Sequence, residues 1–142
     1  MKTANKITRL AMSLILFCTA CQLQAQTKVT TLSVGDSGIH QSSAACLLNV
    51  QTTEFDNISE WGIVYSTNHN PTIENGLKQT AQLQKPSDAR GKQVVVWLTD
   101  LTSKTTYYVR GFVKMKNGNV IYGNEKSFAT KVPTDTDHPR RK

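Results

Sequence analysis

The clearest alternation of polar and apolar side chains lies in residues 101–115, which read LTSKTTYYVRGFVKM. One side of this run is mainly apolar and carries Tyr107, Val109, Gly111, Val113 and Met115. The other side is mixed and carries Thr106, Tyr108, Arg110, Phe112 and Lys114. Because successive residues of a β-strand point to opposite faces of a sheet, this period of two predicts a half-buried strand.

The residues before this strand have the spacing of a tyrosine corner. Leu101 precedes Tyr107 by six residues, and Thr105 lies between them. In β-sandwiches a tyrosine at this position packs its ring in the core and bonds its hydroxyl to a backbone group just upstream. We therefore expect Leu101, Thr105 and Tyr107 to form such a corner, with the Tyr107 ring buried.

Six further runs have the β-branched composition or the alternation of short strands. They cover residues 29–34, 43–51, 60–66, 78–84, 92–98 and 120–130. The run at 92–98 has two faces, with Val95 and Trp97 opposite Val94, Val96 and Leu98. Turn-forming residues separate the runs, including a Gly-Asp-Ser-Gly cluster at 35–38 and the hairpin signal Asn117-Gly118. Seven short strands without a convincing helix predict an all-β, antiparallel sandwich, with a bulge near Gly123 in the last strand.

Residues 1–25 have the features of an export signal. Three cations precede an apolar stretch at residues 10–20, LAMSLILFCTA. Its eleven residues fall short of the roughly 20 that a membrane-spanning helix needs. The sequence therefore predicts a cleaved signal and a chain that works outside the cytoplasm.

Two kinds of processing remain open for this signal. The sequence LQA at residues 23–25 suits an ordinary signal peptidase, which would release a free chain. Alternatively, CTAC at residues 18–21 resembles a bacterial lipoprotein box, so that residues 1–20 would be removed and Cys21 would carry a lipid. The box departs from the usual pattern at its first position, where an aliphatic residue is common.

The charge of the chain gives little support for a nucleic-acid partner. The formal net charge is +7, from 17 Lys and Arg against 10 Asp and Glu. Three of these cations belong to the predicted signal, and three more end a proline-containing segment at 131–142. The body at 28–130 is close to balanced, which predicts one ordinary globular domain followed by a flexible basic tail.

Several of these segments together resemble a known family. The resemblance rests on EWGIVYS at 60–66 with Pro71-Thr72 after it, LTSKTTYYVR at 101–110, Asn117-Gly118, Tyr122-Gly123 and SFAT at 127–130. These residues are similar to fibronectin type III-like domains of exported and surface proteins of Bacteroidetes-type bacteria, over residues 28–130. The resemblance implies an immunoglobulin-like sandwich without catalytic residues. The chain departs from the usual Leu-x-Pro-Asn-Thr turn at Thr102, Ser103 and Lys104.

The sequence offers few candidates for catalysis. Cys46 lies on the apolar side of an alternating run at 44–50, which favours a buried, inert thiol over a nucleophile paired with His40. His69 lies in an Asn- and Pro-containing loop and is interpreted as a turn residue. The sequence has no phosphate-binding loop and no Gly-x-Ser-x-Gly elbow. We therefore expect neither an enzyme nor a cofactor.

The C-terminal tail contains a small group of metal-capable side chains. They are Asp135, Asp137 and His138. A flexible tail without a second cluster of ligands would bind a metal ion only weakly, so no metal site is expected.

A candidate binding face is the outward side of the strand within 101–115. It carries Tyr108, Arg110, Phe112 and Lys114. Aromatic and arginine side chains are enriched at protein interfaces, and an aromatic platform can also stack on sugar rings. The alternative is that neighbouring strands and loops cover these rings, with the Arg110 stem packed along them.

These observations favour a non-enzymatic, exported binding or structural module of the cell envelope or secretome. Its partner would be an unidentified protein or glycan, and it would meet a membrane only through a lipid on Cys21. The alternative is a secreted inhibitor or accessory subunit of an exported enzyme, which would use loops at one end of the sandwich. A third hypothesis is a small enzyme that uses His40 or His69.

Overall fold

The structure is a computed structural model that describes residues 26–85 and 91–133. The predicted signal, the lipid site at Cys21 and the metal-capable side chains of the tail lie outside these residues. Within the described ranges, no helix has the length and apolar character that crossing a membrane requires.

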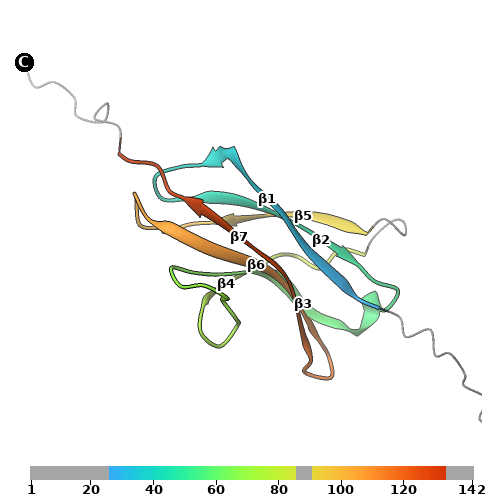
Figure 1. Ribbon diagram of the computed structural model, residues 1–142. Coiled ribbons are helices and arrows are strands. Elements are labelled where there is room, and N and C mark those ends of the chain that lie inside the picture. The colour runs from blue at the N-terminus through green and yellow to red at the C-terminus, as the bar shows by residue number, and fades with distance from the viewer. Residues whose placement is uncertain (1–25, 86–90, 134–142) are drawn as a thin grey trace, which may run out of the picture.

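Seven strands form two antiparallel sheets that pack against each other (Figure 1). The strands are β1 Lys28–Ile39, β2 Ala44–Gln51, β3 Ile58–Ser66, β4 Leu77–Thr80, β5 Lys92–Leu98, β6 Thr106–Met115 and β7 Val120–Ala129. One sheet has the order β1-β2-β5, and the other has the order β4-β3-β6-β7. A short 3-10 helix at Phe55–Asn57 precedes β3. The predicted seven-stranded antiparallel sandwich is confirmed.

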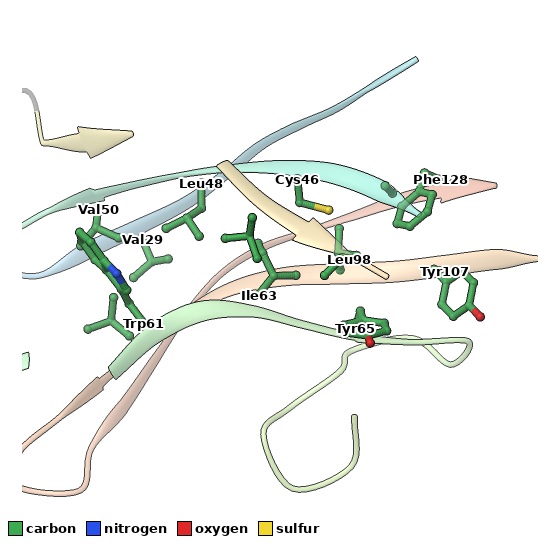
Figure 2. Close-up of a cluster of buried hydrophobic side chains, with 14 of the residues drawn as sticks. Val29, Cys46, Leu48, Val50, Trp61, Ile63, Tyr65, Leu98, Tyr107 and Phe128 are labelled. Atoms are coloured by element: carbon green, nitrogen blue, oxygen red, sulfur yellow. The ribbon is translucent and has the colours of Figure 1, made fainter. Parts of the chain in front are cut away.

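The core lies between the two sheets and is built from the inward sides of the strands (Figure 2). In β2 the fully buried inward residues are Ala44, Cys46, Leu48 and Val50. Trp61 and Ile63 of β3 approach them from the other sheet. Burial raises the pKa of the Cys46 thiol to about 12, because the thiolate would lose its hydration. The prediction of a buried thiol is confirmed.

Tyr107 anchors the turn that leads into β6. Its ring is buried and packs against Tyr65 and Phe128, with centroid distances of 6.2 and 5.8 Å. Its hydroxyl accepts a hydrogen bond from the Thr102 N–H at 3.0 Å. Leu101 is buried beside it at the start of the turn. The ring therefore joins the turn to the core.

A second hydroxyl holds the same turn from the end of β7. The Thr130 hydroxyl donates to the Thr102 carbonyl at 2.7 Å and accepts from the Thr105 N–H at 2.9 Å. These bonds satisfy backbone groups that the turn leaves without a partner in a strand ladder.

The first strand is longer than its sequence pattern predicts. β1 continues through the cluster at 35–38, for which the sequence predicts a turn, and its register on β2 shifts between Val34 and Ile39. The chain turns at 40–43 instead, where the His40 N–H donates to the Ser43 carbonyl at 2.8 Å. Glycine within a strand favours a bulge as well as a turn, so the cluster marks an irregular stretch of β1.

The fourth strand is shorter than predicted and ends at Thr80. Beyond it, the Ala81 N–H donates to the Trp61 carbonyl at 3.1 Å. The indole N–H of Trp61 donates to the Gln82 carbonyl at 3.0 Å. The backbone and the side chain of Trp61 thus hold the segment after β4, which has no further ladder of its own.

One long side of the sandwich is closed where β1 lies beside β7 (Figure 1). Thr31 of β1 is buried, its N–H donates to Asn124 Oδ1 at 3.0 Å, and its carbonyl accepts from Asn124 Nδ2 at 3.1 Å. The Thr31 hydroxyl accepts from the Gly111 N–H at 2.8 Å. A Cβ on Gly123 would lie 3.0 Å from this hydroxyl oxygen, so glycine permits the close approach.

The predicted bulge near Gly123 is confirmed. The pairing of β6 with β7 shifts register between Arg110 and Phe112, which lie opposite Glu125 and Tyr122. Two β7 residues therefore oppose one β6 residue at this point, which is the geometry of a bulge.

Candidate functional site

The binding face predicted on β6 is only partly exposed. Tyr108, Arg110 and Lys114 are half-buried, whereas Phe112 has no exposed surface. At Phe112 the alternative holds, in which neighbouring parts of the chain cover this face. Because Val113 beside it belongs to the core, Phe112 points to the outer side of the four-stranded sheet and needs a cover there.

The loop between β3 and β4, at 67–76, lies on this outer side. Pro71 of the loop is fully buried, and so is Val64 of β3, which lies outside the main core. The Ile73 N–H donates to the Tyr122 hydroxyl on β7 at 3.0 Å. The loop thus reaches from β3 across to β7 and forms a small second core with the outer side of the sheet.

Charged and aromatic side chains fasten the same loop. The Asn70 N–H donates to the Glu125 carboxylate, and His69 Nδ1 lies 2.8 Å from the other carboxylate oxygen. The bond from the Asn70 backbone, followed by that from His69, lowers the pKa of Glu125 below its usual value. The His69 ring lies against Tyr108, with centroids 3.7 Å apart. His69 therefore lies in the loop, as expected, and also joins it to the sheet.

Arg110 takes part in the attachment of β7. Its Nε–H donates to the Gly123 carbonyl at 3.1 Å, and its guanidinium carbon lies 4.7 Å from the centre of the Tyr122 ring. A guanidinium over an aromatic face is attracted by the ring quadrupole. Arg110 and Tyr108 thus contribute to contacts within the chain, which leaves less of either side chain for a ligand.

A more exposed apolar surface lies on the outer side of the three-stranded sheet. Val95 and Trp97 of β5 are 56% and 52% exposed. Leu47 and Ala45 of β2 pair with them and are half-buried. The His40 ring stacks with the Trp97 ring at a centroid distance of 6.3 Å and an interplanar angle of 19°. We call these five residues the Trp97 surface.

The sequence of β5 explains how this surface arises. Val96 and Leu98 point inward and are buried, so alternation turns Val95 and Trp97 outward. The sequence placed these two residues on the correct face but did not indicate that they form a site. The available signal was a large aromatic residue on the side of a strand opposite its apolar face.

The Trp97 surface borders a groove between β4 and β5 with a volume of about 440 Å³. Four of its lining residues carry amide side chains, namely Gln79, Gln82, Gln84 and Gln93. Among its described lining residues there is no carboxylate, and Lys92 is the one cation. Since an amide both donates and accepts hydrogen bonds, the groove suits a neutral, polar ligand.

The described residues offer little catalytic chemistry. They include no group of three or more His, Cys, Asp or Glu side chains that could hold a metal ion. The Cys46 thiol stays protonated at neutral pH because its pKa is about 12, and a thiol is a weak nucleophile in that form. His40 is exposed at the Trp97 surface, whereas Cys46 is fully buried in the core.

Comparison with known proteins reveals a similarity of fold. No protein-family model matches the sequence. No curated protein matches it either. Three solved structures of the sensor domain of the anti-sigma factor RsgI4 from Pseudobacteroides cellulosolvens are similar.

The long form of this sensor domain has a TM-score of 0.56 at 13% identity, over 80% of this chain and 98% of that one. A shorter form has a TM-score of 0.51 at 16% identity, over 75% of this chain and 96% of that one. The solution structure has a TM-score of 0.50 at 17% identity, over 82% of this chain and 91% of that one. At such low identity the likeness shows a shared all-β fold and nothing more specific.

Proposed function

We propose that this chain is an exported, non-enzymatic binding module with a fibronectin type III-like sandwich, and that the Trp97 surface and its groove contact the ligand. The observation that carries the proposal is that Val95 and Trp97 are each more than half exposed on one face of β5. Large apolar side chains exposed side by side mark contact sites, because a complex removes their area from water. The likeness to sensor domains supports binding rather than catalysis.

The ligand class that best fits this surface is a neutral glycan. A sugar ring has an apolar face that can stack on the Trp97 indole, and its hydroxyls can exchange hydrogen bonds with neighbouring amides such as Gln93. Both kinds of group meet where the groove reaches Trp97. The alternative ligand is a protein, whose apolar side chains would cover Trp97 and Val95.

The position of the surface suits an exported module. Lys28, where β1 begins, pairs with Gln51, whereas Trp97 pairs with Ala45. Six strand positions separate Ala45 from Gln51, which corresponds to roughly 20 Å. A lipid on Cys21 would therefore hold the Trp97 end away from the membrane, and cleavage at either predicted site would leave β1 intact.

The test is the binding of the purified, exported chain to a glycan array and to proteins of the envelope. We expect Trp97→Ala to weaken ligand binding at least about tenfold, because it removes the stacking surface. The midpoint of thermal unfolding should change little, because the side chain is half exposed.

Leu77→Ala is the matched control, since Leu77 is 64% exposed on β4 and does not line the groove. Binding that survives Trp97→Ala, or that Leu77→Ala weakens equally, would contradict the proposal. Retention of a glycan or of a protein on the wild-type chain distinguishes the two ligand classes.

A second candidate function is that of a secreted inhibitor or accessory subunit of an exported enzyme. The β3–β4 loop supports it, because this loop is fixed to β7 while the His69 side chain is 67% exposed. A loop held in one conformation loses little conformational entropy when it enters a partner's active site. Tyr108, from the face predicted on β6, would flank it, because its ring lies against His69. Capture of one stoichiometric enzyme, lost in His69→Ala and kept in Trp97→Ala, would favour this function.

A further inference from the structure

The two described sheets have four edge strands, and three of these are closed or short. β1 and β7 lie beside each other and are joined by the Thr31–Asn124 hydrogen bonds. β4 has only four residues, and its Lys78 forms an ion pair with Glu60 at 2.6 Å. The remaining edge is β5, which pairs with β2 on one side only.

The β5 edge lacks the features that normally protect a strand. Its seven residues, KQVVVWL, contain no proline, and the only charge is Lys92 at the first position. Its pairing with β2 runs from Lys92 to Leu98 without a register shift, so no bulge twists the edge away. Natural proteins blunt exposed edges with charge, proline or bulges, because free backbone groups pair readily with another strand. An edge without these devices is suited to being covered.

We infer that β5 pairs with β5 of a second copy of this chain. A closed dimer needs a twofold axis, and two identical edge strands related by such an axis run antiparallel. With the axis at Val95, the two Val95 residues face each other, and Trp97 of each copy lies opposite Gln93 of the other. The two three-stranded sheets then join into one sheet of six strands.

The side chains of β5 are compatible with this register on both faces. Directly opposite residues of an antiparallel pair share a face, so Val94 of one copy meets Val96 of the other on the inward side. That contact extends both cores and covers Val94, which is half-buried in the single chain. On the outward side, the pair of Val95 residues buries apolar area that each copy leaves 56% exposed.

Charge does not oppose the pairing. The two Lys92 side chains lie at opposite ends of the paired strands, six positions apart, which is roughly 20 Å. This exceeds the screening length of about 10 Å at 0.1 M salt, so their repulsion is small.

Self-pairing has two consequences for the module. It lays the second β5 along the edge whose residues line the groove, so the dimer and a ligand in that groove compete for the same place. The twofold axis also reverses the second copy, so the starts of the two β1 strands, at Lys28, lie at opposite ends of the dimer. Pairing therefore belongs to the released form of the chain while its groove holds no ligand.

The test is sedimentation velocity on the exported, processed chain carrying Cys21→Ser, which excludes the lipidated form. We expect a monomer–dimer equilibrium between about 1 and 300 µM, since a seven-residue edge buries less than a standard interface. Val95→Lys places two ammonium groups face to face at the axis, so it should weaken the dimer at least about tenfold. Its unfolding midpoint should stay close to wild type, because Val95 points outward.

Leu77→Lys is the matched control, because it makes the same change at an exposed residue of β4 and should leave the dimer intact. In a second measurement, Val95→Cys should give a disulfide-linked dimer on oxidation, whereas Leu77→Cys should not. A wild-type chain that is monomeric throughout, or a dimer that Val95→Lys leaves unchanged, would overturn the inference. So would a monomer whose β5 edge binds a foreign strand. Failure here would leave the effect of Trp97→Ala on ligand binding untouched.

Discussion

The sandwich is closed along one long side, between β1 and β7, and open along the other, between β4 and β5. On the side of β1 and β7, the Asn124 side chain bonds both backbone groups of Thr31, and Gly123 lets the edges touch. On the side of β4 and β5, the edges stand apart, and a groove of about 440 Å³ lies between them. Both sides belong to the same two sheets, so topology alone does not decide whether an edge is closed.

The two sides differ in what satisfies the backbone groups of their edge strands. Backbone N–H and C=O groups must find partners, and a single asparagine can supply them where a strand is missing. On the open side the partners are left to solvent or to another molecule, and Val95 and Trp97 are exposed beside them. The closed side therefore contributes to stability, and the open side is available for binding.

Replacing Trp61 should lower the stability most, because this buried residue holds the chain segment that borders the open side. Its indole is fully buried, and its N–H holds the chain after β4 at the Gln82 carbonyl. We expect Trp61→Ala to lower the free energy of unfolding by about 3–5 kcal/mol, from lost packing and a cavity. Urea unfolding measures this change.

Trp61→Phe separates the two contributions of this side chain. It keeps an aromatic ring but loses the N–H donor, so we expect a smaller loss of roughly 1–3 kcal/mol. If both variants lost the same free energy, the hydrogen bond to the segment after β4 would account for the whole effect.

Thr31→Val should weaken the closed side and lower the free energy of unfolding by an intermediate amount. Valine keeps the shape of threonine but cannot accept the hydrogen bond from Gly111, whose buried N–H then lacks that partner. An unsatisfied buried donor costs about 1–3 kcal/mol, so unfolding in urea should shift accordingly. Thr30→Val is the control on the adjacent, outward position and should change stability by less than about 0.5 kcal/mol.

The fold could be predicted from the sequence because short β-rich runs are separated by turn-forming residues, and because two of the strands keep a strict period of two. Ala44 to Val50 in β2 and Val94 to Leu98 in β5 alternate between more and less buried positions, as a period of two requires. The pattern was misleading at 35–38, where glycine, aspartate and serine are typical both of turns and of bulges. It also could not show that β4 ends at Thr80, because the bonds to Trp61 that replace its ladder join residues about twenty positions apart.

The candidate site was harder to predict, because alternation gives the side of a strand but not whether that side is covered. Phe112 and Trp97 both lie on the outward side of a predicted strand, yet Phe112 is fully buried and Trp97 is 52% exposed. The difference comes from a loop that is fastened to β7 through His69 and Glu125, which are 56 residues apart in the chain. A local pattern of residues cannot show a contact of that length.

The smallest expected change in stability concerns the β3–β4 loop. This loop covers the outer side of the four-stranded sheet, whereas the Trp97 surface stays exposed. Hydrogen bonds from the Asn70 backbone and from His69 lower the pKa of Glu125 in the folded state. A lowered carboxylate pKa stabilises the folded state above the ordinary value of 4.5, and this contribution is lost as the pH falls through the folded pKa. Because the pair lies near solvent, Glu125→Gln should cost less than about 1 kcal/mol at pH 7.

Hydrogen exchange at the Asn70 amide measures the effect locally, and thermal unfolding measures it globally. The difference between wild type and Glu125→Gln should shrink as the pH falls below 4.5, because the wild-type carboxylate then becomes neutral as well. Glu74→Gln, an exposed substitution in the same loop, should change neither readout. A difference that kept its full size in acid would show that the loop depends on the shape of the Glu125 side chain and not on its charge.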